Sequence, residues 1–329
     1  MIKLENLTFT GAYAQSCQDF INYKRSVGYQ YDTRQCYSVK YLCDYLDVHG
    51  AKLSGLSKEQ VEGFIKHRKG ESTSTQSKRV YIIRQFSQYL ASIGYASYIP
   101  PFNFIKLDKS FTPYIYKHEE ISAILKACDT MEYVHHNPNS HLVYPLLMRM
   151  LFACGLRISE ALRLTKKDVD LATGAIHVRK SKNSNGRIVP MSASLHNRCI
   201  QYCERVGYHP ANDRYFFESR FGKSYKRGSI YNYFRVLVEQ AGIQHQGRGC
   251  GPRLHDARHT YAVYALEHMV NQGMDIYCAL PILSTYMGHR TIESTEKYVR
   301  LIPAFHESII QSMEEVYEGL FPEVSDEYF

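Results

Sequence analysis

The segment from Tyr98 to Pro113 contains three prolines and no helical period, and it divides the sequence into two halves. Proline removes a backbone donor and restricts the residue before it, so such a segment predicts a linker. A chain of 329 residues is also longer than one ordinary domain. We therefore expect two domains, residues 1–99 and 114–329, joined by a linker over residues 100–113.

The first half shows helical periodicity between about Gly11 and Gly94. Val39, Leu42 and Leu46, for example, recur at the spacing that places apolar side chains on one face of a helix. This pattern predicts a small helical domain.

The second half is also mainly helical, but it has one β interruption. Residues 175–179 and 187–189 resemble two short strands, and the polar run 180–186 supplies the turn of a hairpin. A strongly apolar helix is expected at 146–154 and a final amphipathic helix at 303–320, which packs on its own domain or docks on a neighbouring subunit. The sequence thus predicts a mainly α protein, with a helical first domain and an α+β second domain.

Composition narrows the functional classes. Forty Lys and Arg against 32 Asp and Glu give a formal charge of +8, which favours a polyanionic partner only weakly. No segment has the length and apolarity of a membrane span. The nine cysteines form no CxxC pair, and the cluster His135, His136 and His141 has no Cys or carboxylate at ligand spacing. We expect a cytoplasmic protein without a membrane span, metal site or cofactor.

Several polar residues have spacings that suit anion chemistry. His255 and Arg258 are three residues apart, so on a helix both can donate to one anion. Arg157 follows a buried helix, where its guanidinium needs either Glu160 or a phosphate as partner. His289 follows a glycine that predicts a helix end, and Tyr298 comes nine residues later.

Together these residues resemble the tyrosine recombinase (phage integrase) family over roughly residues 112–320. The family's motifs occur in order as Gly155-Leu-Arg157-Ile-Ser-Glu160, Lys182, His255-Asp-Ala-Arg258, Gly288-His289 and Tyr298. Lys182 is preferred to Lys180 as the hairpin lysine because it lies eight residues before Pro190, as in the family pattern. The first half matches the family's N-terminal core-binding domain in size and position.

The resemblance implies a mechanism and a catalytic set. Two forked guanidinium groups and two histidines would hold the non-bridging oxygens of a DNA phosphate. A tyrosine with an ordinary pKa near 10 would attack the phosphorus, and His255 is a candidate for assisting the departure of its proton. A lysine would protonate the leaving 5′ oxygen, which gives a 3′-phosphotyrosine and a free 5′ hydroxyl. The implied catalytic residues are Tyr298, Arg157, Lys182, His255, Arg258 and His289.

Other interpretations of these residues stay open. Arg157 could pair with Glu160 as a core residue, His289 could be an ordinary helix-end histidine, and Tyr286 is the nearest rival of Tyr298. Basic residues that would contact DNA phosphates, or that would equally belong to a solvated surface, are Lys78, Arg79, Arg84, Lys180 and Arg187.

The biological role is the least constrained expectation. Pro281, where many family members continue a plain helix, resembles the version carried by transposon-encoded recombinases. We expect an integrase or transposase of a mobile element, in which the two domains clamp duplex DNA at core sites. The working unit would be a tetramer on two DNA sites, with accessory DNA-bending or directionality proteins left open. The alternatives are a recombinase that resolves chromosome or plasmid dimers, a type IB topoisomerase and a non-catalytic DNA-binding factor.

Overall fold

The computed structural model describes residues 7–29, 31–105, 112–179, 186–207, 214–245 and 251–302. Residue contacts divide the chain into two compact units, Met1–Phe111 and Thr112–Phe329. The division falls inside the proline-containing segment. The predicted C-terminal helix at 303–320 lies outside the described residues.

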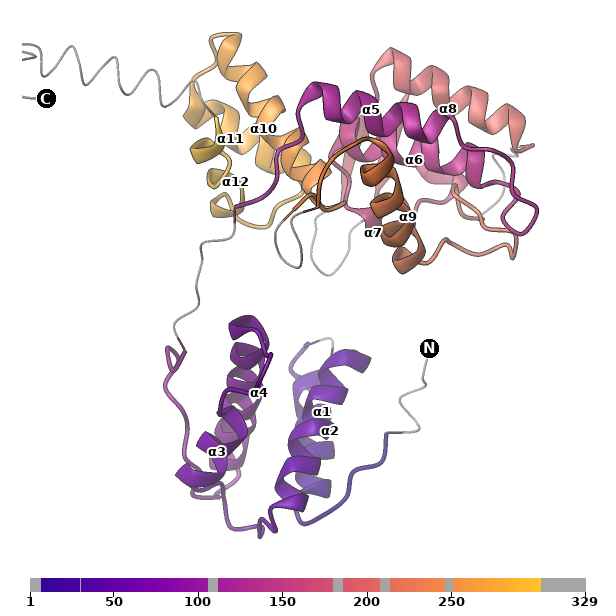
Figure 1. Ribbon diagram of the computed structural model, residues 1–329. Coiled ribbons are helices and arrows are strands. Elements are labelled where there is room, and N and C mark those ends of the chain that lie inside the picture. The colour runs from indigo at the N-terminus through magenta and orange to yellow at the C-terminus, as the bar shows by residue number, and fades with distance from the viewer. Residues whose placement is uncertain are drawn as a thin grey trace, which may run out of the picture. The chain divides into compact units, whose positions relative to one another are not determined.

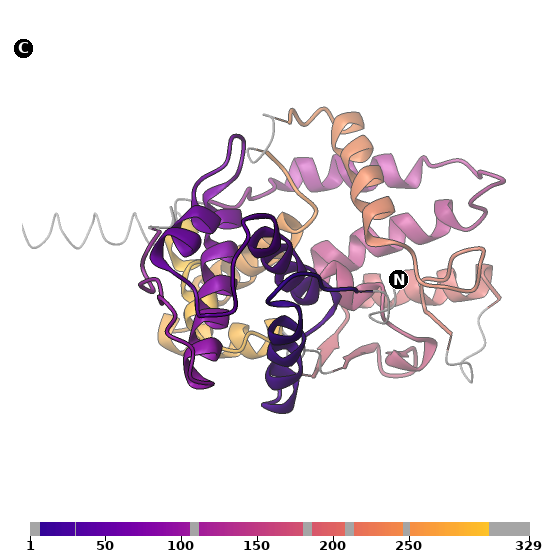
Figure 2. The same cartoon turned by 90° about the horizontal axis from the view of Figure 1, so that it is seen from below.

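The first unit consists of helices that pack side by side (Figure 1), and Figure 2 shows the same helices from below. At its centre the rings of Phe20 and Phe86 meet edge to face, with centroids 5.5 Å apart. Ser57 and Gln60 form a reciprocal capping box that starts the third helix. The helices are α1 (Ala14–Ser26), α2 (Thr33–Val48), α3 (Lys58–Ile65) and α4 (Thr73–Ser92).

The second unit combines helices with a small sheet. Its longer helices are α5 (His118–Asp129), α6 (Ser140–Cys154), α8 (Ala193–Arg205), α9 (Arg227–Gln240), α10 (Asp256–Asn271) and α11 (Ile276–Met287). Its short helical elements are α7 (Ile158–Ala161), η2 (Lys166–Asp168), α12 (Glu293–Glu296) and η3 (Val299–Leu301).

The predicted hairpin is present, and a third strand extends it. Strands β1 (Val169–Asp170), β2 (Ala175–Val178) and β3 (Arg187–Pro190) form an antiparallel sheet in the order β1-β2-β3. Ile176 lies opposite Val189 and both are fully buried, so this face of the sheet packs on the helices. The mainly α fold with a small sheet agrees with the fold class predicted from the sequence.

Two apolar clusters lie within the second unit. One surrounds the buried helix α6 and includes side chains of α5, α8, α9 and the sheet. The other joins α10, α11 and the segment around Tyr298; these elements lie together in Figure 1. Helix α10 contacts both α6 and α11, and it contributes Ala257 to the first cluster and Ala262 to the second. Within the described part of the chain, no helix has the length and apolarity to cross a membrane.

Candidate active site

Two helices of the second unit end at the same guanidinium group. Helices α6 and α11 are each followed by a glycine in the left-handed conformation, Gly155 with φ +57° and Gly288 with φ +63°. Arg258 donates from Nη1 to the carbonyl of Gly155 at 2.7 Å and from Nη2 to the carbonyl of Met287. Carbonyls at helix C-termini carry partial negative charge. They hold Arg258 where it is only 3% exposed.

A buried carboxylate gathers three arginines at this point. Glu160 accepts a hydrogen bond from Arg157 at 2.8 Å and two from Arg187 at 3.2 and 2.9 Å. Arg258 lies 3.8 Å from the same carboxylate. Burial opposes ionisation of Glu160, but the hydrogen bond and charge of Arg187 outweigh it and lower the pKa to about 2.

The positive charge of these arginines exceeds the negative charge of Glu160. Burial and the neighbouring charge of Arg157 lower the pKa of Arg258 to about 9, so Arg258 remains a cation at neutral pH. Three guanidinium groups against one carboxylate leave an excess of two positive charges. Arg157 is 24% exposed at its side chain, so it is open to an incoming anion. The excess positive charge suits a phosphate, which forked donors bind through two oxygens.

Tyr298 is buried near Arg258 and Arg157 of the same chain. It is 1% exposed, and its hydroxyl lies 3.0 Å from Nδ1 of His259. Burial raises the pKa of Tyr298 to about 12, while the charges of Arg258 and Arg157 act in the opposite direction. The phenol is therefore protonated at neutral pH, beside cations that would stabilise its ionised form.

The predicted histidines border this phenol. The ring of His289 stacks on that of Tyr298 with centroids 6.4 Å apart, and its Nδ1 is 2.8 Å from Oγ1 of Thr295. Burial and the charge of Arg258 lower the pKa of His289 to about 3. His255 precedes α10 and is exposed on one side; the protein around it and the charge of Arg258 lower its pKa as well. Both imidazoles are neutral at neutral pH.

The structure thus brings five residues that the sequence singled out into one cluster: Arg157, His255, Arg258, His289 and Tyr298. The sequence of the second unit matches the model of the phage integrase family over residues 115–304, more than half of the chain. The chain belongs to the phage integrase family.

Relatives of known name support this membership. The integrase/recombinase y4rB of Sinorhizobium fredii is 27% identical over 311 residues, which cover 93% of this chain and 98% of that protein. The tyrosine recombinase XerD of Oceanobacillus iheyensis is 26% identical over 265 residues, 78% of this chain and 82% of its own length. As a member of this family, the chain is a DNA-binding enzyme that breaks and rejoins DNA.

Solved structures share the fold of this phage integrase family member. The Tn1549 transposon integrase in complex with transposon right end DNA has a TM-score of 0.64 at 17% identity, over 86% of this chain and 94% of that one. The XerH recombinase bound to difH substrate has a TM-score of 0.61 at 16% identity, over 86% of this chain and 92% of that one.

Other predicted residues of the integrase fold have different surroundings. Lys182 and Lys180 lie outside the described residues, in the segment that joins β2 to β3. Arg187, predicted as a DNA contact, is only 6% exposed at its side chain and is bound to Glu160. Its position on β3 opposite Val178 directs it to the carboxylate instead of to solvent. Arg187 therefore belongs to the buried cluster of arginines around Glu160.

The basic residues of α4 also differ from one another. Arg79 is a correction to the predicted DNA contacts, because it is 7% exposed and bound to Glu71 and to the carbonyls that end α3, including that of Lys66 at 2.9 Å. Arg84 is half-buried and donates to the carbonyl of Pro100. Lys78 is exposed and remains a predicted phosphate contact.

Sequence reasoning did not single out His259 and treated Glu160 only as an alternative partner of Arg157. The signal for Glu160 was present, since a carboxylate three residues after Arg157 can meet it. His259 directly follows Arg258, but its side chain was one histidine among fifteen. Only the fold shows that it reaches Tyr298.

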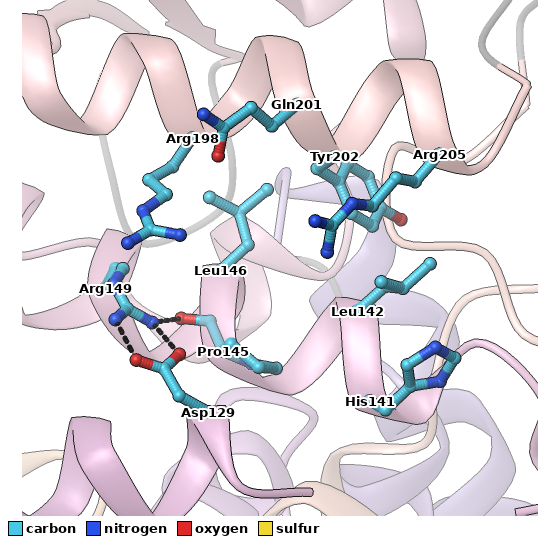
Figure 3. A pocket seen from close by; sticks show the side chains of 10 residues that line it. All are labelled: Asp129, His141, Leu142, Pro145, Leu146, Arg149, Arg198, Gln201, Tyr202 and Arg205. Carbon is cyan, nitrogen blue, oxygen red and sulfur yellow. Dashed lines mark hydrogen bonds and ion pairs between the residues drawn. The ribbon is translucent and has the colours of Figure 1, made fainter. Parts of the chain in front are cut away.

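A separate cavity of about 280 Å³ lies between α6 and α8 (Figure 3). Arg198 and Arg205 extend into it from α8, while Arg149 of α6 is bound to Asp129 at 2.8 and 2.6 Å. The cavity contains none of the predicted catalytic residues. Among the described residues, no three His, Cys, Asp or Glu side chains form a group that could hold a metal ion.

Proposed function

We propose that this chain is a site-specific recombinase of a mobile element that cuts duplex DNA through Tyr298. The phenol oxygen attacks the scissile phosphorus, the bond to the 5′ oxygen breaks, and a 3′-phosphotyrosine forms with a free 5′ hydroxyl. A hydroxyl of a second strand reverses the step on a new partner. One phosphodiester replaces another, so no external energy source enters the balance.

The observation that supports this most is the burial of Tyr298 near Arg258, in a cluster with excess positive charge. A phosphodiester gains negative charge on its non-bridging oxygens as the phenol attacks. Arg157 and Arg258 would stabilise that charge, and His255 and His289 would add hydrogen bonds. Lys182 is proposed as the acid that protonates the leaving 5′ oxygen.

Two features favour a mobile element over chromosome maintenance. The relative y4rB, whose match covers 93% of this chain, is named as an integrase/recombinase. Helix α11 also contains Pro281, the feature that resembles transposon-encoded members. The second candidate is resolution of chromosome or plasmid dimers, which the similarity to XerD favours.

The assembly is part of the proposal. A homotetramer would hold two DNA core sites, and the segment 303–320 would exchange between neighbouring subunits. Accessory proteins that bend DNA or set direction would be further partners. A type IB topoisomerase would use the same tyrosine chemistry without pairing two sites, and a non-catalytic DNA-binding factor would form no covalent adduct.

The decisive experiment traps the enzyme on nicked suicide substrates made from the DNA that flanks its own gene. The wild-type chain is expected to form a covalent adduct through the 3′ phosphate, whereas Tyr298→Phe binds the same DNA without an adduct. Tyr286→Phe is the matched control, because Tyr286 of α11 stacks on Tyr261 of α10 and the change should leave cleavage intact. An adduct that persists in Tyr298→Phe would exclude this nucleophile.

A plasmid assay separates the remaining functions. Exchange between two sites supports a recombinase, whereas relaxed circles alone support a topoisomerase. Integration into a target DNA that carries no dimer-resolution site supports the mobile-element role. Activity restricted to sites from the chromosome terminus would support dimer resolution instead.

A further inference from the structure

His259 holds the hydroxyl of the proposed nucleophile. Its Nδ1 lies 3.0 Å from the Tyr298 oxygen, and His259 and Tyr298 are 6% and 1% exposed, respectively. Among the described residues, His259 is the hydrogen-bond partner of the Tyr298 hydroxyl. A buried hydroxyl that lost its partner would carry a free-energy cost of about 1–3 kcal/mol.

The two predicted histidines do not hold the phenol in this way. His289 directs Nδ1 to Thr295, and its ring stacks on the face of the Tyr298 ring. His255 packs edge-on against His259 with ring centroids 4.9 Å apart, one helical turn earlier. His259 is therefore the imidazole with a ring nitrogen at the reacting oxygen.

We propose that His259 positions Tyr298 and accepts its proton when Tyr298 attacks the DNA phosphate. The inference rests on the proposed function and deepens it. The O–H bond of Tyr298 breaks, its proton moves to Nδ1, and its oxygen forms the bond to phosphorus. The 5′ oxygen leaves with the electron pair of the broken P–O bond and takes a proton from the general acid. His259 therefore acts in place of His255, the residue that sequence reasoning favoured for this step.

The charges around His259 would make proton acceptance from Tyr298 depend on bound DNA. Burial lowers the pKa of His259 to about 3, and the neighbouring groups His255, Lys297, Arg253 and Arg258 act in the same direction. Tyr298, with a pKa of about 12, keeps its proton under these conditions. A phosphodiester between Arg157 and Arg258 adds negative charge, which raises the pKa of the imidazole. Proton acceptance thereby becomes coupled to DNA binding.

The test uses single-turnover adduct formation by the full chain on nicked suicide DNA. His259→Asn keeps a polar atom near the Nδ1 position but cannot accept a proton at neutral pH. We expect adduct formation to slow by about 100-fold at pH 7 with unchanged DNA affinity. The deficit should shrink as the pH rises toward 10, because hydroxide then ionises the phenol without a base. His268→Asn, an exposed position on the same helix, is the matched control.

Two results would overturn the inference. One is a His259→Asn rate close to that of the wild-type chain, and the other is a deficit that stays constant with pH, which would indicate a structural role. His259→Gln provides a second polar variant if the Asn variant does not fold. Tyr298→Phe separates the two proposals. An adduct in that variant would overturn the proposed nucleophile. If Tyr298→Phe forms no adduct but His259→Asn cleaves normally, only the role of His259 is overturned.

Discussion

Arg187 donates two hydrogen bonds to Glu160, at 3.2 and 2.9 Å, and the two side chains are each 6% exposed. This pair joins β3 to the short helix α7, and it leaves Arg157 partly open. The Glu160 carboxylate holds the buried Arg187 and Arg258 in place. Arg157 is the most exposed of the three and remains accessible to a phosphate. Glu160 would therefore affect both the stability of the fold and the proposed anion binding.

Glu160→Gln should destabilise the chain by about 3 kcal/mol at pH 7, because it leaves buried guanidinium groups without a counter-charge. The pKa of Glu160 is lowered from 4.5 to about 2, so its contribution is complete above pH 4.5 and is lost as the pH falls toward 2. Urea unfolding of both chains across this range measures the difference. Glu239→Gln, at an exposed site on α9, should show no such pH-dependent loss.

Arg258→Lys should abolish most cleavage although it keeps the positive charge. A lysine cannot span the carbonyls of Gly155 and Met287 as the two guanidinium nitrogens do. We expect adduct formation to fall by about 100-fold or more, with a lower melting temperature. Arg235→Lys on the exposed face of α9 is the control. A rate within threefold of wild type, about 0.7 kcal/mol in the barrier, would show that the fork is dispensable.

Gly288→Ala should displace Arg187 in addition to straining the backbone. Its φ is +63°, and an added Cβ would lie 2.9 Å from Nη1 of Arg187. Gly273 has φ +82° with no atom within 4 Å of such a Cβ, so Gly273→Ala measures the strain alone. The Gly288 variant should lose more stability and also cleavage rate. Equal losses in the two variants would exclude the contact with Arg187.

Lys78 and Arg79 should respond differently to salt. Lys78→Ala should reduce the slope of log affinity against log salt by about one, as expected for one lost phosphate contact. Arg79→Ala should instead destabilise the first unit, because Arg79 is bound to Glu71 and to the end of α3. Binding titrations at several salt concentrations, together with thermal melts, measure both effects. A change in slope for Arg79 alone would reverse this assignment.

The sequence predicted those features that local patterns encode. The hairpin follows from two β-rich segments around a polar turn, and α6 follows from a long apolar run that ends at Gly155. Five site residues came from ordered motifs. Contacts between residues that are distant in the sequence leave no such local pattern. Arg187 resembled a surface cation until β3 placed it against Glu160, and His259 gained significance only when the chain brought Tyr298 to it.

The hydrogen bond between His259 and Tyr298 is made within a single chain, and it has a consequence for mixed assemblies. In the proposed mechanism, each protomer would supply its own nucleophile and its own Arg258. A protomer that lacks the phenol and another that lacks Arg258 cannot restore a working centre between them, whatever their ratio. In a heterogeneous complex, only strands held by intact protomers would be cut.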